Sequence, residues 1–222
     1  MKKLLFLILV LFTFVMQAQQ VIDLSTGLLT PASSLPKPEK IVEENDNSIV
    51  VNYKFTYALI EQDSVYPDNV IISLPGFNNE TRDGFPCVSR GMDSFFVPLN
   101  SNPQMSVLSS SYIELEYDIA SARKPMSLTN TEPYAKSNVF PIIAYSGFWP
   151  NSICEPLPIG RHRHQHIARV EINPIQYNME SKKVRILTNL KYKITYVPIT
   201  DEITENECCD YIINPNFASE EL

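Results

Sequence analysis

The chain has 222 residues, a formal net charge of −7 at pH 7, 17 prolines and 6 glycines. The acidic balance argues against nucleic acid as a partner, because a phosphate backbone requires clustered lysine and arginine. The many prolines favour loops and edge strands over long helices. Once an N-terminal export segment is set aside, about 200 residues remain, enough for one sizeable domain or two small ones.

The N-terminal segment has the pattern of a secretory signal peptide. Two lysines precede an apolar run that begins at Leu4 and reaches Phe12, and the small residue Ala18 closes the segment. The run is shorter than the stretch of about 20 residues that a membrane helix needs. A retained membrane anchor is the alternative interpretation. We predict a signal peptide over residues 1–18, no retained membrane span, and an exported protein that is periplasmic, on the cell surface or secreted.

The first predicted strands follow a polar segment. Residues 19–47 contain several prolines and an acidic cluster, so we expect an extended leader there. A strand is predicted over residues 49–59, where apolar side chains occupy every second position and therefore share one face. A shorter strand is expected over residues 69–74, closed by Pro75 and Gly76.

Three further strands are predicted before a long connection. Residues 94–97 and 105–108 continue the pattern, and in residues 112–119 apolar side chains alternate with acidic ones. Residues 120–158 are rich in proline and aromatic residues, and we expect them to form a long connection packed on the domain.

The last predicted strands are residues 167–173 and 184–197, and the polar residues 177–183 are typical of a hairpin turn between them. Outside the signal peptide no segment has helical periodicity. Short strands with polar outer faces predict an all-β fold, an antiparallel β-sandwich with long proline-rich connections, over residues 48–199.

All three histidines occur in one short segment. If residues 161–172 form one continuous strand, His162, His164 and His166 lie on the same face. Alternating imidazoles suit zinc, copper or nickel. No carboxylate flanks them, however, and a solvated sheet end can also hold histidines. We therefore predict no metal site, with these three histidines as the only candidate ligands.

The four cysteines are Cys87, Cys154, Cys208 and Cys209. An even number in an exported protein permits disulfides, and Cys87–Cys154 is the candidate pair, although all four thiols could also be free. Neighbouring cysteines pair with each other only with strain. A Cys154–His162 dyad would lack an oxyanion-hole signature. We predict no catalytic residues and no cofactor.

A resemblance to a known family is carried by the C-terminal strands. Residues 167–178, which include the run Pro-Ile-Gln-Tyr-Asn, precede a polar turn and the strand that starts at Val184. This sequence resembles the closing hairpin of the N-terminal prodomains of gingipain-type cysteine peptidases. Upstream, Gly84–Ser89 and Phe95–Pro98 resemble the Gly-x-Pro-x-Leu-Pro segment of that family and the strand behind it. The resemblance covers about residues 70–198, and no single motif in it is diagnostic.

The chain departs from the family pattern at a few positions. Met179 and Ser89 stand where prolines are usual, and Arg163-His164 replaces the usual Arg-Gly. Residues 209–222 are similar to the first strand and helix start of the catalytic domain in that family. We therefore expect a linker and the start of a catalytic domain over residues 200–222, with the catalytic His and Cys further on.

The resemblance implies an exported β-sandwich, of a Gram-negative bacterium, that keeps a gingipain-type cysteine peptidase latent and assists its folding, in cis or in trans. Latency of this kind is substrate-like occlusion, in which a basic side chain fills the specificity pocket. By position, Arg161 and Arg163 are the inhibitory candidates, because the planar guanidinium pairs bidentately with a carboxylate. A solvated strand face is the alternative explanation for both arginines. The alternative function is a free-standing exported β-sandwich that binds a ligand without a protease partner. In neither case is the chain itself an enzyme.

Overall fold

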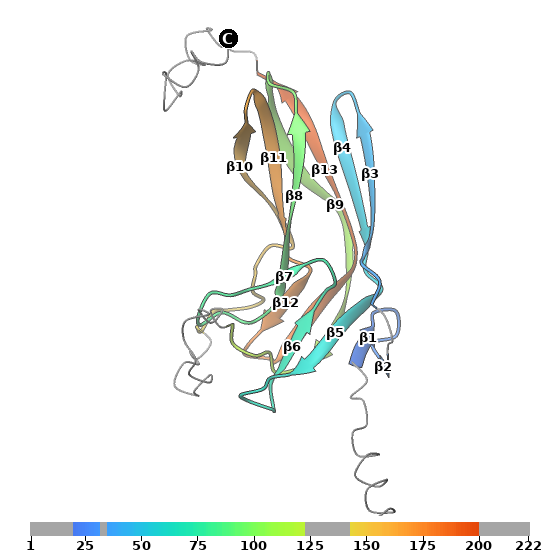
Figure 1. The fold of residues 1–222 in the computed structure, drawn as a ribbon, viewed down its shortest axis with the longest axis vertical. Helices are drawn as coiled ribbons and strands as arrows, with labels where there is room; N and C mark the ends of the chain where they lie inside the picture. The colour runs from blue at the N-terminus through green and yellow to red at the C-terminus, as the bar shows by residue number, and fades with distance from the viewer. Residues whose placement is uncertain (1–19, 32–34, 123–142, 200–222) are drawn as a thin grey trace, which may run out of the picture.

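The computed structural model describes residues 20–31, 35–122 and 143–199. The signal peptide expected over residues 1–18 and the linker and catalytic-domain start expected over residues 200–222 lie outside the described residues. The described part contains thirteen strands and no helix, so the all-β prediction is confirmed (Figure 1). Accordingly, this part of the chain has no helix that could cross a membrane.

The strands form three antiparallel sheets. The first has the order β2-β1-β5-β6 and comprises β1 (Gln20–Asp23), β2 (Leu29–Pro31), β5 (Tyr57–Gln62) and β6 (Val70–Ser73). The second has the order β10-β11-β8-β7 and comprises β7 (Asn78–Asn79), β8 (Ser89–Val97), β10 (Cys154–His162) and β11 (Gln165–Ile172). The third has the order β12-β13-β4-β3, with β9 on the other side of β13, and comprises β3 (Glu39–Asn45), β4 (Ser48–Lys54), β9 (Ser101–Glu116), β12 (Ile175–Asn178) and β13 (Lys183–Pro198).

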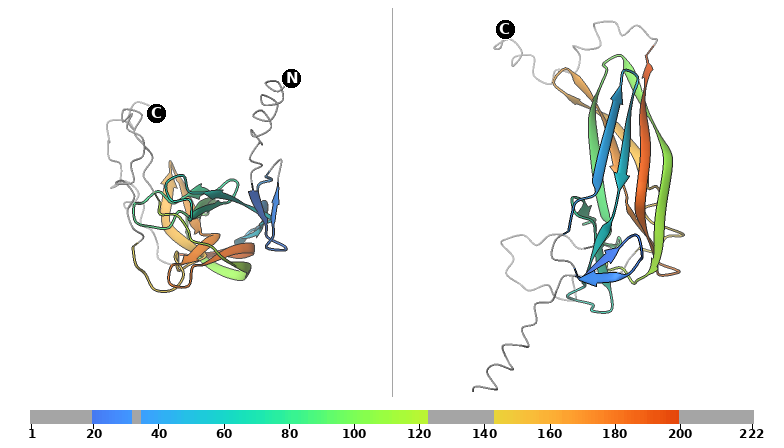
Figure 2. Two further views of the ribbon diagram at one scale, coloured as in Figure 1. Left: turned by 90° about the horizontal axis from the view of Figure 1, so that it is seen from below. Right: turned by 90° about the vertical axis from the view of Figure 1, so that its right-hand side faces the viewer.

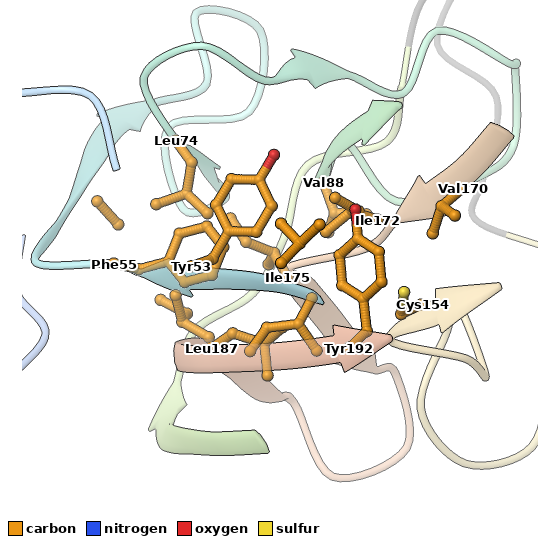
Figure 3. Packing of buried hydrophobic residues seen from close by; sticks show 14 of the residues in the cluster. Tyr53, Phe55, Leu74, Val88, Cys154, Val170, Ile172, Ile175, Leu187 and Tyr192 are labelled. Atoms are coloured by element: carbon orange, nitrogen blue, oxygen red, sulfur yellow. The ribbon is translucent and has the colours of Figure 1, made fainter. Parts of the chain in front are cut away.

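The second and third sheets contribute most of the core, the first sheet adds Ile22, Ile60 and Ile72, and β13 is the central element. β9 pairs with β13 along its whole length, while β12 and β4 share its other edge. β9 and β13 run side by side from one end of the domain to the other (Figure 2). The buried face of β13 is the one that the sequence predicts: Val184, Ile186, Leu190, Tyr192, Ile194 and Tyr196. Figure 3 shows part of this strand packed among residues of the facing sheet. The sandwich prediction is confirmed.

The prediction of a single strand over residues 49–59 is wrong, because two strands of different sheets occupy this segment. β4 and β5 are separated at Phe55 and Thr56, where the Phe55 N–H donates to the Thr188 carbonyl at 2.9 Å. The chain changes sheet at this point, and the buried positions shift by one residue. Ala58 and Ile60 are buried beyond the break, rather than the odd-numbered positions that a continuous strand requires.

The extended leader expected over residues 19–47 is instead largely part of the fold. β1 pairs with β5, and Val21, Ile22 and Leu24 are almost fully buried. β3 pairs along its length with β4 and forms the edge of the third sheet. The prolines conceal these strands in the sequence, because Pro31 ends the short edge strand β2 and Pro36 and Pro38 lie just before β3.

The two strands expected over residues 105–108 and 112–119 form one strand, β9. The pairing of β9 with β13 has two register shifts, at which Thr188 of β13 and Leu108 of β9 have no paired residue on the other strand. The polar run Ser109–Ser111 lies between these irregularities and interrupts the apolar alternation. The sequence pattern therefore predicts two strands where the structure has one. The long connection is also shorter than expected, since β10 already begins at Cys154.

Candidate functional site at the hairpin pole

One end of the sandwich gathers three hairpin turns and the end of the last strand. The turns are Asp46–Asn47 between β3 and β4, Pro98–Asn100 between β8 and β9, and Arg163–His164 between β10 and β11. All three lie at the top of Figure 1, where β13 also ends. The Ile199 N–H donates to the Asn100 carbonyl at 2.9 Å, which fixes the chain leaving β13 to one of these turns. We call this end of the domain the hairpin pole.

The β10–β11 turn replaces the continuous strand that was expected over residues 161–172. His162 pairs directly with Gln165, so that Arg163 and His164 form a two-residue turn. Arg163 has a φ of 55°, in the left-handed region. The two-residue turns that suit such hairpins need positive φ at one or both central positions, which glycine adopts most readily. The usual Arg-Gly of the resembling family is Arg-His here, and glycine was the signal whose absence concealed the turn.

The turn also separates the histidines, and their predicted arrangement on one face is wrong. His162 lies opposite Gln165, whereas His166 lies opposite Arg161, so His162 and His166 are on opposite faces of the hairpin. His164 is in the turn itself. Across the described residues, no three His, Cys, Asp or Glu side chains are grouped so that they could hold a metal ion.

The two candidate arginines are presented on a braced hairpin. Arg161 and Arg163 are both exposed, and neither has an ion-pair partner within the described part of the chain. Below them the register shifts between Leu157 and Gly160. The Arg169 side chain donates to the Pro158 carbonyl from Nε at 3.1 Å and from Nη2 at 2.8 Å, which closes this irregularity. The end of the β10–β11 hairpin is therefore held in place, while the side chains of Arg161 and Arg163 remain exposed to solvent.

An open hollow of about 450 Å³ lies beside this hairpin at the same pole. The polar lining comes from Glu44, Asn45 and Asp46 at the β3–β4 hairpin and from Gln165 of β11. The apolar lining comes from Phe96 and Val97 of β8, from Pro98 of the following turn and from Tyr196 of β13. The Tyr196 N–H donates to the Asn47 carbonyl at 2.9 Å, which joins β13 to the β3–β4 turn. Sequence reasoning missed this hollow, because its lining comes from four separate parts of the chain.

The candidate disulfide is not formed. Among the described residues, Cys154 is a buried free thiol at the start of β10, so no bond joins it to Cys87. Cys154 packs in the core, where Figure 3 shows it together with Tyr192. Burial, and secondly the negative charge of Asp93, raise the pKa of the Cys154 thiol to about 12. Such a thiol stays protonated and is a poor nucleophile.

Asp93 is a buried acidic group in this core, and sequence reasoning did not single it out. Its side chain is 7% exposed. The Tyr53 hydroxyl donates to its two oxygens at 2.8 and 3.0 Å, and the Tyr192 hydroxyl donates to it as well. Lys40 of β3 completes the cluster, with Nζ 2.6 Å from Oδ1. Because these residues come from β3, β4, β8 and β13, the cluster ties the two sheets together.

A second charged cluster lies away from the hairpin pole, near the start of β8. Glu80 accepts from Arg82 Nη2 at 2.8 Å and from Arg90 Nη1 at 2.5 Å, and Arg90 Nη2 reaches Glu171 at 2.5 Å. Burial alone would raise the pKa of Glu80, but the bonds from Arg82, Arg90 and two backbone N–H groups outweigh it and lower that pKa to about 2. Each charge here has a partner, so the cluster acts as a structural brace.

The fold and the site define the class of protein: an all-β sandwich module with charged turns at one end. No protein-family model and no curated protein matches the chain in sequence. In three dimensions it is similar to a chain of the gingipain K structure from Porphyromonas gingivalis that addresses zymogenic latency. That match has a TM-score of 0.62 and 16% identity, over 81% of this chain and 99% of that chain.

A second solved structure is similar over a comparable length. It is the complex of the pro- and mature domains of RgpB from Porphyromonas gingivalis, with a TM-score of 0.59 and 18% identity, over 73% of this chain and 84% of that chain. The resemblance to gingipain prodomains that the sequence predicts is thereby confirmed at the level of the fold.

Proposed function

We propose that this chain is an exported, non-catalytic prodomain module that keeps a gingipain-type cysteine peptidase latent and assists its folding. The observation that carries the proposal is the fold, which is shared over 99% of a chain from a structure concerned with gingipain K latency. The second similar structure is a complex of a pro- and a mature domain. By analogy, the partner of this chain is the peptidase domain, joined in cis or met in trans.

The proposed mechanism is substrate-like occlusion through the β10–β11 hairpin, with Arg163 as the main anchor and Arg161 beside it. Arg163 is exposed, and its φ of 55° is a backbone conformation that few L-residues adopt. Strain of this kind persists where the surrounding structure imposes it and is often associated with binding sites. A guanidinium at the tip suits a specificity pocket that contains a carboxylate.

The position of the hairpin also suits an intramolecular partner. β13 ends at the hairpin pole, and the bond from the Ile199 N–H to the Asn100 carbonyl holds residue 199 at that end. We propose that residues 200–222 are a linker and the start of a catalytic domain, which follow β13 in the chain. At the other end of the chain, we propose that residues 1–18 are a signal peptide. A tether of this kind raises the effective concentration to about millimolar, so modest affinity is sufficient for latency.

The test is inhibition of a gingipain-type peptidase, preferably the cognate one, by residues 19–222 and by matched variants. Arg163→Asn removes the guanidinium but suits a left-handed backbone. Its control is Lys182→Asn, since Lys182 is also a basic turn residue with positive φ (53°) but lies in the β12–β13 hairpin at the other end of β13. Loss of a central anchor costs 2 kcal/mol or more, so Arg163→Asn with Arg161→Ala should raise the inhibition constant at least about 30-fold.

The outcomes separate the role from the mechanism. Inhibition that is lost in the double variant and kept in Lys182→Asn supports both. Inhibition that survives in the double variant keeps the role and rejects these two arginines as anchors. Failure of the unmodified chain to bind a cognate peptidase leaves a free-standing binding module as the better explanation. Arg163→Lys then tests whether the pocket requires the guanidinium fork or only a positive charge.

A further inference from the structure

One residue that lines the hollow at the hairpin pole, Tyr196, carries a buried hydroxyl that the described part of the domain leaves unsatisfied. Tyr196 is only 9% exposed, and its hydroxyl has no hydrogen-bond partner among the described residues. The Nδ1 atom of His166 is also buried without a hydrogen-bond partner among the described residues. His166 pairs in the sheet with Val97, which lines the hollow. Buried hydroxyl and ring nitrogen atoms are nearly always paired in folded proteins, and an exception calls for an explanation. A ligand that supplies hydrogen-bond donors is one such explanation.

The chemistry of the lining selects the ligand. The carboxylates of Glu44 and Asp46 only accept hydrogen bonds, and the hydroxyl of Tyr196 can accept as well. Burial, and secondly the charge of Glu44, raise the pKa of Tyr196, which keeps this hydroxyl neutral. An anion would be repelled, and an uncharged ligand would leave both carboxylates without a counter-charge. A cation that carries several N–H donors satisfies every group, and the exposed ring of Phe96 at the rim can add a cation–π contact.

The described part of this chain does not supply that cation. Neither Glu44 nor Asp46 forms an ion pair there, although the β10–β11 hairpin with its two arginines is close by. Residues 200–222, which follow β13 in the sequence, contain no lysine or arginine. A basic side chain that pairs with these carboxylates would therefore come from outside the described residues and outside residues 200–222.

We propose that the hollow formed by Glu44, Asp46, Phe96 and Tyr196 is a binding site for an arginine or lysine side chain of a partner polypeptide. This inference rests on the lining and on the unpaired hydroxyl, and it holds whether or not the hairpin arginines inhibit a peptidase. It gives the hairpin pole two recognition elements of opposite sign: a basic tip that enters a partner and an acidic hollow that receives a basic side chain from one.

The experiment is an NMR titration of the isotope-labelled chain, residues 19–222, with the blocked tripeptide acetyl-Gly-Arg-Gly-amide. Its citrulline analogue has nearly the same shape without the charge. We expect saturable shifts at residues 44–46, 96–98, 165 and 196, weakened at least 10-fold with the citrulline peptide and reduced by added salt. Methylguanidinium, which carries the cation without a peptide, should bind at least several-fold more weakly than the tripeptide.

Two variants locate the site. Glu44→Gln should weaken arginine-peptide binding about 5-fold or more, as expected for loss of a charge partner. Glu39→Gln, at the other end of the same exposed strand, should not weaken it. Tyr196→Phe should weaken binding with an otherwise unchanged spectrum; because it alters a buried residue, the exposed Glu44 variant remains decisive if it misfolds. The proposal is overturned by an absence of saturable shifts, by equal binding of the citrulline peptide, or by equal effects of the Glu44 and Glu39 variants. Methylguanidinium binding as tightly as the tripeptide would overturn the assignment to a polypeptide partner.

Discussion

Replacing Asp93 with alanine is expected to destabilise the domain strongly, because it leaves two buried hydroxyls without an acceptor. The hydroxyls of Tyr53 and Tyr192 both donate to this carboxylate, and both tyrosines are less than 10% exposed. An orphaned buried hydroxyl costs about 1–3 kcal/mol, so the two together cost about 2–6 kcal/mol. Lys40 adds little, because its side chain is 33% exposed and can turn to water.

The assay is urea unfolding followed by the fluorescence of Trp149, the only tryptophan in the chain. With a urea m-value of about 2 kcal/mol/M, a loss of about 4 kcal/mol moves the midpoint down by about 2 M. The diagnostic control is a triple variant, in which Asp93→Ala is combined with phenylalanine at Tyr53 and Tyr192. Removing the orphaned hydroxyls should restore part of the lost stability. A midpoint for Asp93→Ala within about 0.5 M of the unmodified chain, or a triple variant less stable than the single one, would refute this account of the cluster.

Three further changes test the packing and charge assignments. The lowered pKa of Glu80 contributes stability that is present above the ordinary glutamate pKa of 4.5 and is lost as the pH falls towards about 2. Glu80→Gln should therefore flatten this part of the curve of stability against pH by about 2–3 kcal/mol. An unchanged slope would contradict the ion-pair assignment. Gly91→Ala places a Cβ 2.5 Å from the ring of Phe77 and should cost about 1–3 kcal/mol in urea unfolding, with partial rescue by Phe77→Leu; equal losses in the single and double variants would contradict it. In a variant that keeps only Cys154, iodoacetamide at pH 8 should react at least about 100-fold more slowly with the folded protein than in urea, whereas comparable rates would show that this thiol is accessible.

The strongly periodic strands could be predicted from the sequence, and the joints between strands could not. The alternation over residues 184–197 places every predicted apolar side chain of β13 in the core, because one face of this strand is buried along its whole length. The change of sheet at Phe55 is invisible to the same reasoning, since apolar residues continue across it and only the buried positions shift. The turn at Arg163 was missed for a related reason, because neither of its central residues is glycine.

The candidate site was only half predictable, for a physical reason. Arg161 and Arg163 lie in one short segment, and their exposure follows from local sequence. The acidic hollow depends on pairing of distant strands: Tyr196 reaches the β3–β4 turn only because β13 pairs with β4, and Phe96 lies there only because β8 pairs with β11. The same distance in sequence hides the buried carboxylate of Asp93, whose partners come from three other strands.

The arrangement of charge at the hairpin pole gives a partner one preferred orientation. The β10–β11 hairpin carries Arg161 and Arg163, and the β3–β4 hairpin carries Glu43, Glu44 and Asp46 at the same end of the domain. The strands beneath these hairpins fix the separation between the two groups of charges. Charges held in this way are already ordered before association, and a complementary partner is oriented while it approaches. Charge changes on the acidic turn should therefore lower the association rate and its dependence on salt. Loss of an arginine that becomes buried in the partner should instead raise the dissociation rate, which provides a kinetic means of telling the two elements apart.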